Sequence, residues 1–185
     1  MSEQTVQTPA LMDVEHLAAI RANVERFQRA AVTRWVTDQS TVLDVAPQDH
    51  AGVRSLLPDG ARLETLDIDP RAGATYTADL CASNAHLPAQ RFDCVFCTEV
   101  LEHTLQPFDA VDTLYRLLRP GGRLLLTVPF NFRIHGPLPD CWRFTEHGLR
   151  ALLGSYTELE IDGLPTPDRP LMPTHYTVAA ARPLP

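Results

Sequence analysis

A chain of 185 residues with 44% hydrophobic and 21% charged residues has the length of one domain and the composition of a globular protein. Its formal net charge of -7 gives no electrostatic reason to approach nucleic-acid phosphates or an anionic membrane. All 16 basic residues are arginine, which excludes mechanisms that need a Schiff-base lysine or a phosphate-loop lysine.

The first residues are acidic and lack the basic-then-apolar pattern of a signal peptide, and no apolar run approaches the ~20 residues that span a bilayer. We therefore expect a cytoplasmic protein with no membrane partner. The cysteines are too few for a disulfide framework and are expected to be reduced thiols. They are Cys81, Cys94, Cys97 and Cys141.

Two periodicities follow one another along the chain. Apolar residues recur at spacings of three and four from Val14 to Val36, which predicts a helix with one buried face. Short β-branched or leucine-rich runs then alternate with stretches long enough for helices, which is typical of a parallel sheet with crossover helices. These expected strands begin at Thr41, Arg62, Thr75, Phe92 and Arg123.

Four further elements are expected, and the last three of them lie in the proline-rich end of the chain. An amphipathic helix covers Phe108 to Leu118 before Pro120 and Gly121, and a second helix follows Thr145, whose side chain suits an N-cap. Two strands, TELEIDG and THYTVAAA, complete the pattern. We expect one doubly wound α/β domain (1–185) with a seven-stranded, mostly parallel sheet whose last strand is antiparallel. It divides into an N-terminal helical segment (1–38), a core (41–153) and a C-terminal strand pair (154–185).

Polar side chains stand where the expected strands end. The first strand ends at Asp44, the second carries Asp67, the third ends at Asp79, and the fourth ends at Thr98 and Glu99. An open parallel sheet binds ligands beyond the carboxyl ends of its strands, and a buried carboxylate without a partner is costly. These acids therefore favour a polar ligand over a packed core. Asp67 is placed to accept hydrogen bonds from two ribose hydroxyls, with a plain surface acid as the alternative.

Five motifs in order resemble those of the class I S-adenosylmethionine-dependent methyltransferases, in particular the small methyltransferase type 11 group. They are TVLDVA, LETLDIDP, ADLCASNAHLP, FDCVFCTEVLEH and LYRLLRPGGRLLLTVP. A further stretch, PDCWRFTEHGL, is similar to a signature of one branch of these enzymes. The resemblance runs from about Thr41 to Leu153 and implies a Rossmann-like fold whose core binds S-adenosylmethionine and releases S-adenosylhomocysteine.

The resemblance also implies which residues face the cofactor. Asp44 and the turn after it would face the methionine part, and Asp67 would hold the ribose. The adenine would lie between Asp79 and Leu80, and the cavity near the sulfonium would be lined by the end of the fourth strand. The implied set is Asp44, Ala46, Pro47, Gln48, Asp67, Ile68, Asp79, Leu80, Thr98 and Glu99.

The turn after the first strand departs from the GxGxG pattern of the family. It reads APQDHAG and keeps only Gly52. Glycine lets a backbone approach a ligand closely. Alanine at position 46 is expected to cost little, whereas Pro47 removes an N–H and fixes its φ.

We assign the acceptor of the methyl group to the loop PFNFRIHGPLPDCWRF, where the resemblance places segments over the reacting methyl. Its proline, aromatic and arginine content exceeds what a simple connection needs. The candidate bases are His135 in this loop and His103, for which a packing and hydrogen-bonding role is the favoured alternative. The candidate acceptor-binding residues are Arg133, Asp140, Trp142 and Arg143. Structural ion pairs among the charged ones are the equal alternative.

No metal is expected from the sequence. The residues that could suggest one show no tight ligand spacing such as HxxxH. They are His50, His135, Asp140, Cys141 and His147.

The function expected is methyl transfer from S-adenosylmethionine to an oxygen or nitrogen of a small molecule. Nucleic-acid methylation is disfavoured because CTEV replaces the motif that such enzymes carry after the fourth strand. The N-terminal helix, the 130–144 loop and the last prolines would form the acceptor site, and a homodimer could supply further walls. One alternative, favoured by the altered turn, is a module that binds the cofactor or its product without methylating. A nicotinamide oxidoreductase is disfavoured by the absence of GxGxxG.

Overall fold

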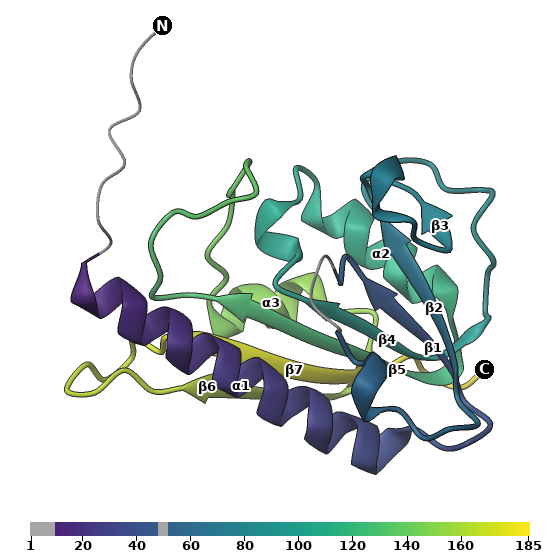
Figure 1. Cartoon of the computed structure of the whole chain (residues 1–185), viewed down its shortest axis with the longest axis horizontal. Coiled ribbons are helices and arrows are strands. Elements are labelled where there is room, and N and C mark those ends of the chain that lie inside the picture. Colours follow the sequence, from purple (N-terminus) through teal and green to yellow (C-terminus); the bar gives the residue numbers. More distant parts are fainter. Residues whose placement is uncertain (1–9, 48–51) are drawn as a thin grey trace, which may run out of the picture.

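The computed structural model describes residues 10–47 and 52–185, and its centre is a seven-stranded sheet (Figure 1). The strand order is β3-β2-β1-β4-β5-β7-β6. The strands are β1 (Thr41–Val45), β2 (Arg62–Asp67), β3 (Tyr76–Thr77), β4 (Phe92–Thr98), β5 (Leu118–Pro129), β6 (Thr157–Leu164) and β7 (His175–Ala181). The chain starts in the middle of the sheet, runs outward to β3 and then from β4 in the other direction, which confirms the doubly wound α/β fold.

The strand directions also agree with the prediction. β1 pairs in parallel with β2 and β4, and β4 pairs in parallel with β5. The last strand, β7, is antiparallel to both of its neighbours, β5 and β6. The carboxyl ends of β1, β2, β4 and β5 therefore lie at one edge of the sheet. The strand order reverses between β1 and β4, which is the place where this kind of sheet binds ligands.

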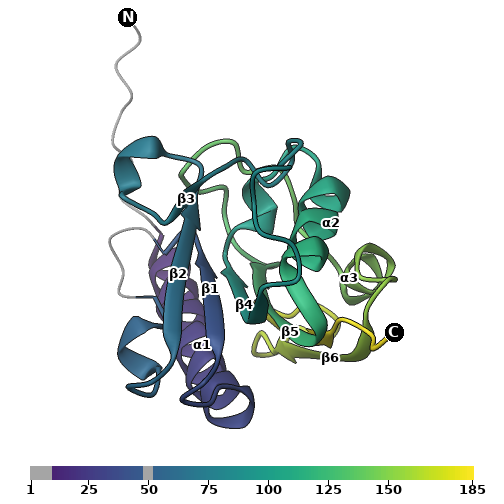
Figure 2. The ribbon, with the colours of Figure 1, turned by 90° about the vertical axis from the view of Figure 1, so that its right-hand side faces the viewer.

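The long helix α1 (Leu11–Trp35) lies across one face of the sheet (Figures 1 and 2). Its Ala31 and Val32 pack with Val42, Phe96 and Leu125 of the central strands in a small apolar core. The helix confirms the periodicity read from the sequence, although it begins before Val14. Because α1 packs directly on β1, β4, β5 and β7, its polar side chains can reach the edge of the sheet where the carboxyl ends of the parallel strands lie.

Two shorter helices, α2 (Pro107–Leu117) and α3 (Glu146–Leu152), cover the opposite face and enclose the larger core. The Oγ1 atom of Thr145 accepts a hydrogen bond from the Gly148 N–H at 3.1 Å, which confirms the predicted cap of α3. The helix α2 ends at Leu117 because the chain enters β5 at Leu118, before the proline and glycine that were expected to stop it.

The connections between the first strands carry fewer helices than predicted. Where the sequence suggested crossover helices, the described residues form the 3-10 turns η1 (Arg54–Leu56) after β1 and η2 (Pro70–Ala72) after β2. A third turn, η3 (Leu101–His103), lies between β4 and α2. Pro58 lies between η1 and β2 and Pro88 lies between β3 and β4, and proline lacks the N–H that a helix interior needs. The face covered by α1 thus carries one helix in the described part of the chain.

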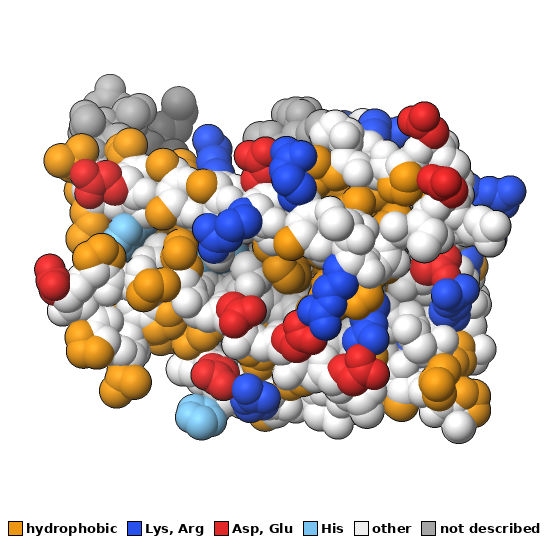
Figure 3. All heavy atoms as spheres, turned by 90° about the horizontal axis from the view of Figure 1, so that it is seen from below, with side chains coloured by type: hydrophobic (Ala, Val, Ile, Leu, Met, Phe, Trp, Pro, Cys, Tyr) orange, Lys and Arg blue, Asp and Glu red, His pale blue; other side chains and the backbone are white. Residues whose placement is uncertain are grey.

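The face of the molecule in Figure 3 shows mixed charge rather than a patch of one sign. On the face in Figure 3, acidic and basic side chains are interspersed, and apolar side chains gather at the end where α1 begins. None of the helices within the described ranges combines the length and apolar character needed to cross a membrane. Cys94 and Cys97 are buried in β4, and burial raises the pKa of both thiols, so neither is a reactive thiolate.

Candidate functional site

Polar side chains converge at the carboxyl edge of β1, β2 and β4. The register pairs Val45 of β1 with Leu66 on one side and with Cys97 on the other. Asp67 and Thr98 therefore each lie one residue beyond that level, with Ala46 between them. The chain order predicted this convergence correctly.

Asp44 holds the returning end of the turn after β1. Its carboxylate is buried, and Oδ2 accepts a hydrogen bond from the Val53 N–H at 3.0 Å. Burial raises the pKa of Asp44 to about 6, although the Val53 N–H opposes the shift. Gly52 has a φ of 52°, and a Cβ there would lie 2.0 Å from Asp44 Oδ2. The one glycine kept in this turn is thus required for the approach of the chain to Asp44.

The backbone of Ala46 contradicts the expectation that alanine would cost little at this position. Its N–H donates to the Leu66 carbonyl at 2.7 Å, and its φ is 50°, in the left-handed region that favours glycine. A non-glycine residue in this region costs about 1–2 kcal/mol, so alanine at this position is not cheap. Pro47 follows in the described chain and is half-buried, whereas Gln48 lies outside the described residues.

Asp67 and its neighbour fit the ribose and base of an adenosyl group. Asp67 is buried at the end of β2, where its Oδ1 accepts from the Asp69 N–H at 2.8 Å. No described residue donates to Oδ2, so this acceptor is open to a ligand hydroxyl. Ile68 beside it is 65% exposed and offers an apolar surface for a flat ring. An open carboxylate acceptor beside an apolar surface therefore fits the cofactor that the sequence motifs imply.

In the stretch expected to flank the adenine, only one of the two side chains is accessible to a ligand. Asp79 is exposed, and its Oδ1 accepts from the Cys81 N–H at 2.9 Å. The Leu80 side chain packs in the larger core, so any contact of Leu80 with a ligand must come from its backbone. A pocket of about 400 Å³ lies next to this stretch, between residues 81–85 and α2. It shares no residue with the acids at the strand ends, so we define the site by those side chains.

Glu99 is held by a network of hydrogen bonds that links four segments, namely the end of β4, β5, β7 and α1. Its Oε1 accepts from Thr127 Oγ1 at 2.8 Å and lies 2.7 Å from Nε2 of His175, which is fully buried at the start of β7. The Asn23 amide nitrogen on α1 lies 2.8 Å from His175 Nδ1. Since an amide nitrogen only donates, Nδ1 accepts and Nε2 carries the proton given to Glu99. Thr98 is also within reach of α1, with the Gln28 amide 3.5 Å from its hydroxyl.

The sequence did not reveal His175 or its partners. Asn23 and Gln28 interrupt the buried, otherwise apolar side of a helix, and His175 opens an apolar strand, so each is a single polar residue in its own segment. The only local signal was the presence of polar residues at positions that the helical and strand periods assign to the interior.

Most of the candidate acceptor residues brace the loop between β5 and α3. Arg143 forms a two-pronged ion pair with Asp140, at 2.6 and 2.8 Å, and also donates to the carbonyls of Phe132 and Arg133. These contacts correspond to the structural alternative for Asp140 and Arg143. Arg133 itself is exposed. Trp142 donates through Nε1 to the Thr104 carbonyl at 2.7 Å and remains 40% exposed.

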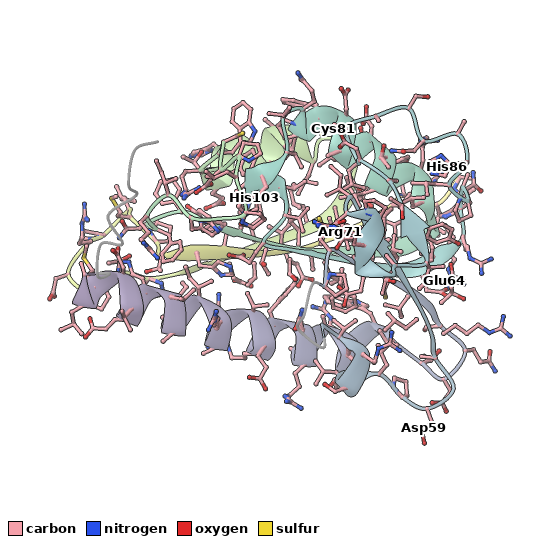
Figure 4. The ribbon with its side chains drawn as sticks, turned by 45° about the horizontal axis from the view of Figure 1, so that its top comes forward. Asp59, Glu64, Arg71, Cys81, His86 and His103 are labelled. Carbon is pink, nitrogen blue, oxygen red and sulfur yellow. The ribbon has the colours of Figure 1, made fainter. Side chains whose placement is uncertain are left out.

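The loop rests on η3 and brings His135 beside His103. Their rings meet edge to face with centroids 5.0 Å apart. Both Nε2 atoms lie near the Oε1 of Glu102, at 3.7 Å from His103 and 3.8 Å from His135. We name Glu102, His103 and His135 the Glu-His-His cluster. The sequence pointed to both histidines but missed Glu102 (Figure 4 labels His103 on the side of the sheet where α2 lies).

Burial perturbs the protonation of this cluster. Glu102 is fully buried, and burial together with the nearby Glu99 raises its pKa well above the usual range. Burial also lowers the pKa of His135, against the opposing effect of Asp140. Asp140 in turn has its pKa held well below the usual range by the Arg143 guanidinium. The imidazole of His135 is therefore neutral near pH 7 and carries a free lone pair.

Comparison with known proteins gives a consistent picture. The family described as methyltransferase domain matches residues 15–158. A ubiquinone biosynthesis O-methyltransferase of Serratia proteamaculans (strain 568) is 28% identical over 100 residues, which are 47% of this chain and 42% of that protein. The chain thus spans less than half the length of the curated relatives that it matches.

Solved structures share the fold at low identity. A SAM-dependent methyltransferase from Archaeoglobus fulgidus has a TM-score of 0.69 at 12% identity, over 92% of this chain and 98% of that one. A Haemonchus contortus phosphoethanolamine N-methyltransferase 2, solved with phosphomonomethylethanolamine and S-adenosylhomocysteine, has a TM-score of 0.63 at 15% identity, over 84% and 52%. The family match, the sheet order and the acids at the strand ends agree: the chain belongs to the methyltransferase-domain family, within the class I S-adenosylmethionine-dependent methyltransferases.

Proposed function

We propose that this chain transfers the methyl group of S-adenosylmethionine to an oxygen or nitrogen of a small molecule. The observation that carries the proposal is the buried Asp67 at the end of β2, with Oδ2 open, within a methyltransferase sheet. The cofactor supplies an electrophilic methyl on a sulfonium, so the chain has only to align the acceptor and take up or release its proton.

Four segments would hold the cofactor. Asp67 accepts from the ribose hydroxyls, Ile68 covers the base, and the turn from Asp44 through Pro47 faces the methionine end, where Gln48 belongs to the same proposal. The segment at Asp79 and Leu80 borders the base. Glu99 and Thr98 lie at the β4 end, where the network through His175 keeps the Glu99 carboxylate in place.

The acceptor would enter from the side of the 130–144 loop. There the Glu-His-His cluster offers imidazole lone pairs that can take a proton from a hydroxyl or an amine. The open surfaces of Trp142 and Arg133 would contact the body of the acceptor. Large apolar side chains are exposed on the first turn of α1 and on the loop, namely Leu11, Met12, Ile134 and Leu138. They support an acceptor with an apolar part.

Turnover with a panel of acceptors tests the proposal. Phenols, alcohols, amines and carboxylates would be incubated with methyl-labelled S-adenosylmethionine, and we expect label on an oxygen or nitrogen of one class. His135→Ala should lower kcat by about 10²–10⁴-fold and leave S-adenosylhomocysteine affinity within about 2-fold. Binding of the cofactor without methylation of any class would favour the alternative of a non-methylating module. We also propose a cytoplasmic location. A homodimer, in which the second copy completes the walls of the acceptor site, is part of the same proposal.

A further inference from the structure

The Glu-His-His cluster has the geometry of a metal site. One ligand atom from each of Glu102, His103 and His135 lies within 4.8 Å of the others. Ligands at about 2.1 Å from a tetrahedral cation lie about 3.4 Å apart. The distances from Glu102 Oε1 to the two imidazoles, 3.7 and 3.8 Å, exceed this value by less than half an ångström. Small rotations of the side chains would close the set around one ion.

The Nδ1 atom of each imidazole is hydrogen-bonded to an acceptor, as in known metal sites. His103 Nδ1 lies 2.9 Å from the Pro139 carbonyl, and His135 Nδ1 lies 3.1 Å from Asp140 Oδ2. Both partners only accept, so both Nδ1 atoms carry a proton and both Nε2 atoms present a lone pair toward Glu102. Metal-binding histidines are oriented in this way by an acceptor on the second nitrogen. Arg143 holds Asp140 in place for this purpose.

The carboxylate of Glu102 gives a second, independent indication that this cluster binds a ligand. Its side chain is fully buried, and both of its carboxylate oxygens lack a hydrogen-bond partner among the described residues. Such an arrangement is costly for a carboxylate unless a proton or a cation compensates it. The neighbouring imidazoles have no proton to give from Nε2. A cation between the three side chains would satisfy all of them together.

We infer that Glu102, His103 and His135 bind one divalent transition-metal cation, such as Zn²⁺, Mn²⁺ or Fe²⁺. Two imidazoles and one carboxylate suit these ions better than Mg²⁺ or Ca²⁺, which prefer an all-oxygen shell. The three ligands leave at least one position open. The two histidines remain 15% and 19% exposed, so a small molecule can reach that position. This inference replaces the expectation of no metal, which considered spacing within single segments only.

The open position would take the acceptor, a role that rests on the proposed function. A hydroxyl bound to such a cation loses its proton to solvent more readily, which leaves its oxygen ready to accept the methyl group. The cation then removes the need for a histidine to act as base, and His103 and His135 act as ligands.

Cobalt binding to the chelator-treated protein tests the site. We expect one Co²⁺ per chain with a visible absorption band, displaced by Zn²⁺ and unaffected by millimolar Mg²⁺. The variants Glu102→Gln and His135→Ala should weaken binding by about 100-fold or more, and Asp140→Asn by about 10-fold. His86→Ala is the matched control, because His86 is exposed and lies away from His103 (Figure 4). It should bind Co²⁺ like the wild type.

The outcomes separate this inference from the proposed function. Glu102→Gln removes a buried charge, so we expect it to remain folded, and its circular dichroism and S-adenosylhomocysteine affinity would verify this. Absence of Co²⁺ binding, or equal binding by the wild type and Glu102→Gln, would overturn the metal site. Co²⁺ binding that depends on the cluster in a protein without affinity for S-adenosylhomocysteine would keep the site and remove the methyltransferase function.

Discussion

Replacing Ala46 with glycine should stabilise the protein, which reverses the usual effect of adding a glycine. Ala46 has a φ of 50°, and its N–H is fixed by the Leu66 carbonyl, so the strained conformation cannot relax. Relief of the left-handed strain is worth about 1–2 kcal/mol. The greater freedom of glycine in the unfolded chain removes about 0.4–1 kcal/mol. With the middle of both ranges, the free energy of unfolding should therefore rise by about 0.8 kcal/mol.

Urea denaturation at constant pH measures this change. Ala151→Gly is the matched control, because Ala151 lies inside the helix α3 and glycine there should lower the free energy of unfolding by about 1 kcal/mol. If both variants lose the same free energy of unfolding, the positive φ of Ala46 does not strain the native turn. Titration of the double variant Ala46→Gly/Pro47→Gly with S-adenosylhomocysteine extends the test. Tighter binding would mean that the native turn only tolerates the cofactor, and weaker binding would mean that it makes contacts of its own.

Three further predictions concern buried polar groups. The folded state raises the pKa of Asp44 from 3.8 to about 6, so Asp44 should lower the free energy of unfolding by about 2 kcal/mol as pH rises from 4 to 7. Asp44→Asn should remove that slope in urea titrations, and an unchanged slope would refute it. His175→Ala empties a fully buried site and unpairs Asn23, so it should destabilise by about 2–4 kcal/mol, whereas the exposed His147→Ala should change stability by less than about 0.5 kcal/mol. Arg143→Gln should expose the 130–144 loop to limited proteolysis, and an unchanged cleavage pattern would show that the Asp140 pair does not hold it.

The fold was predictable because its signals are local. Periodicity located α1 and α2, and the alternation of strands and connections predicted a doubly wound, mostly parallel sheet. The crossover helices were overpredicted, because connection length alone does not account for prolines such as Pro58 and Pro88. The strand-end acids were found for the same local reason, since the carboxyl ends of parallel strands meet at one edge.

The rest of the site depends on contacts between distant segments. His175 lies 76 residues from Glu99 and 152 residues from Asn23, so no spacing rule connects them. Glu102 and His135 likewise meet only because the loop after β5 folds back on η3. The strain at Ala46 also escaped prediction, because φ is set by the surrounding strands and not by the identity of the residue.

The affinity of the wild type and Asp67→Asn for S-adenosylhomocysteine, measured by calorimetry, tests the central claim most directly. Asparagine can keep the hydrogen bond from the Asp69 N–H while replacing the open Oδ2 with a donor. We predict that the wild type binds and that Asp67→Asn binds about 10–100-fold more weakly, through loss of a charge-assisted hydrogen bond of about 1.5–3 kcal/mol. Asp59→Asn, at an exposed position away from this edge (Figure 4), should bind like the wild type. A wild type that does not bind, or an Asp67→Asn variant with the wild-type dissociation constant, would contradict the account.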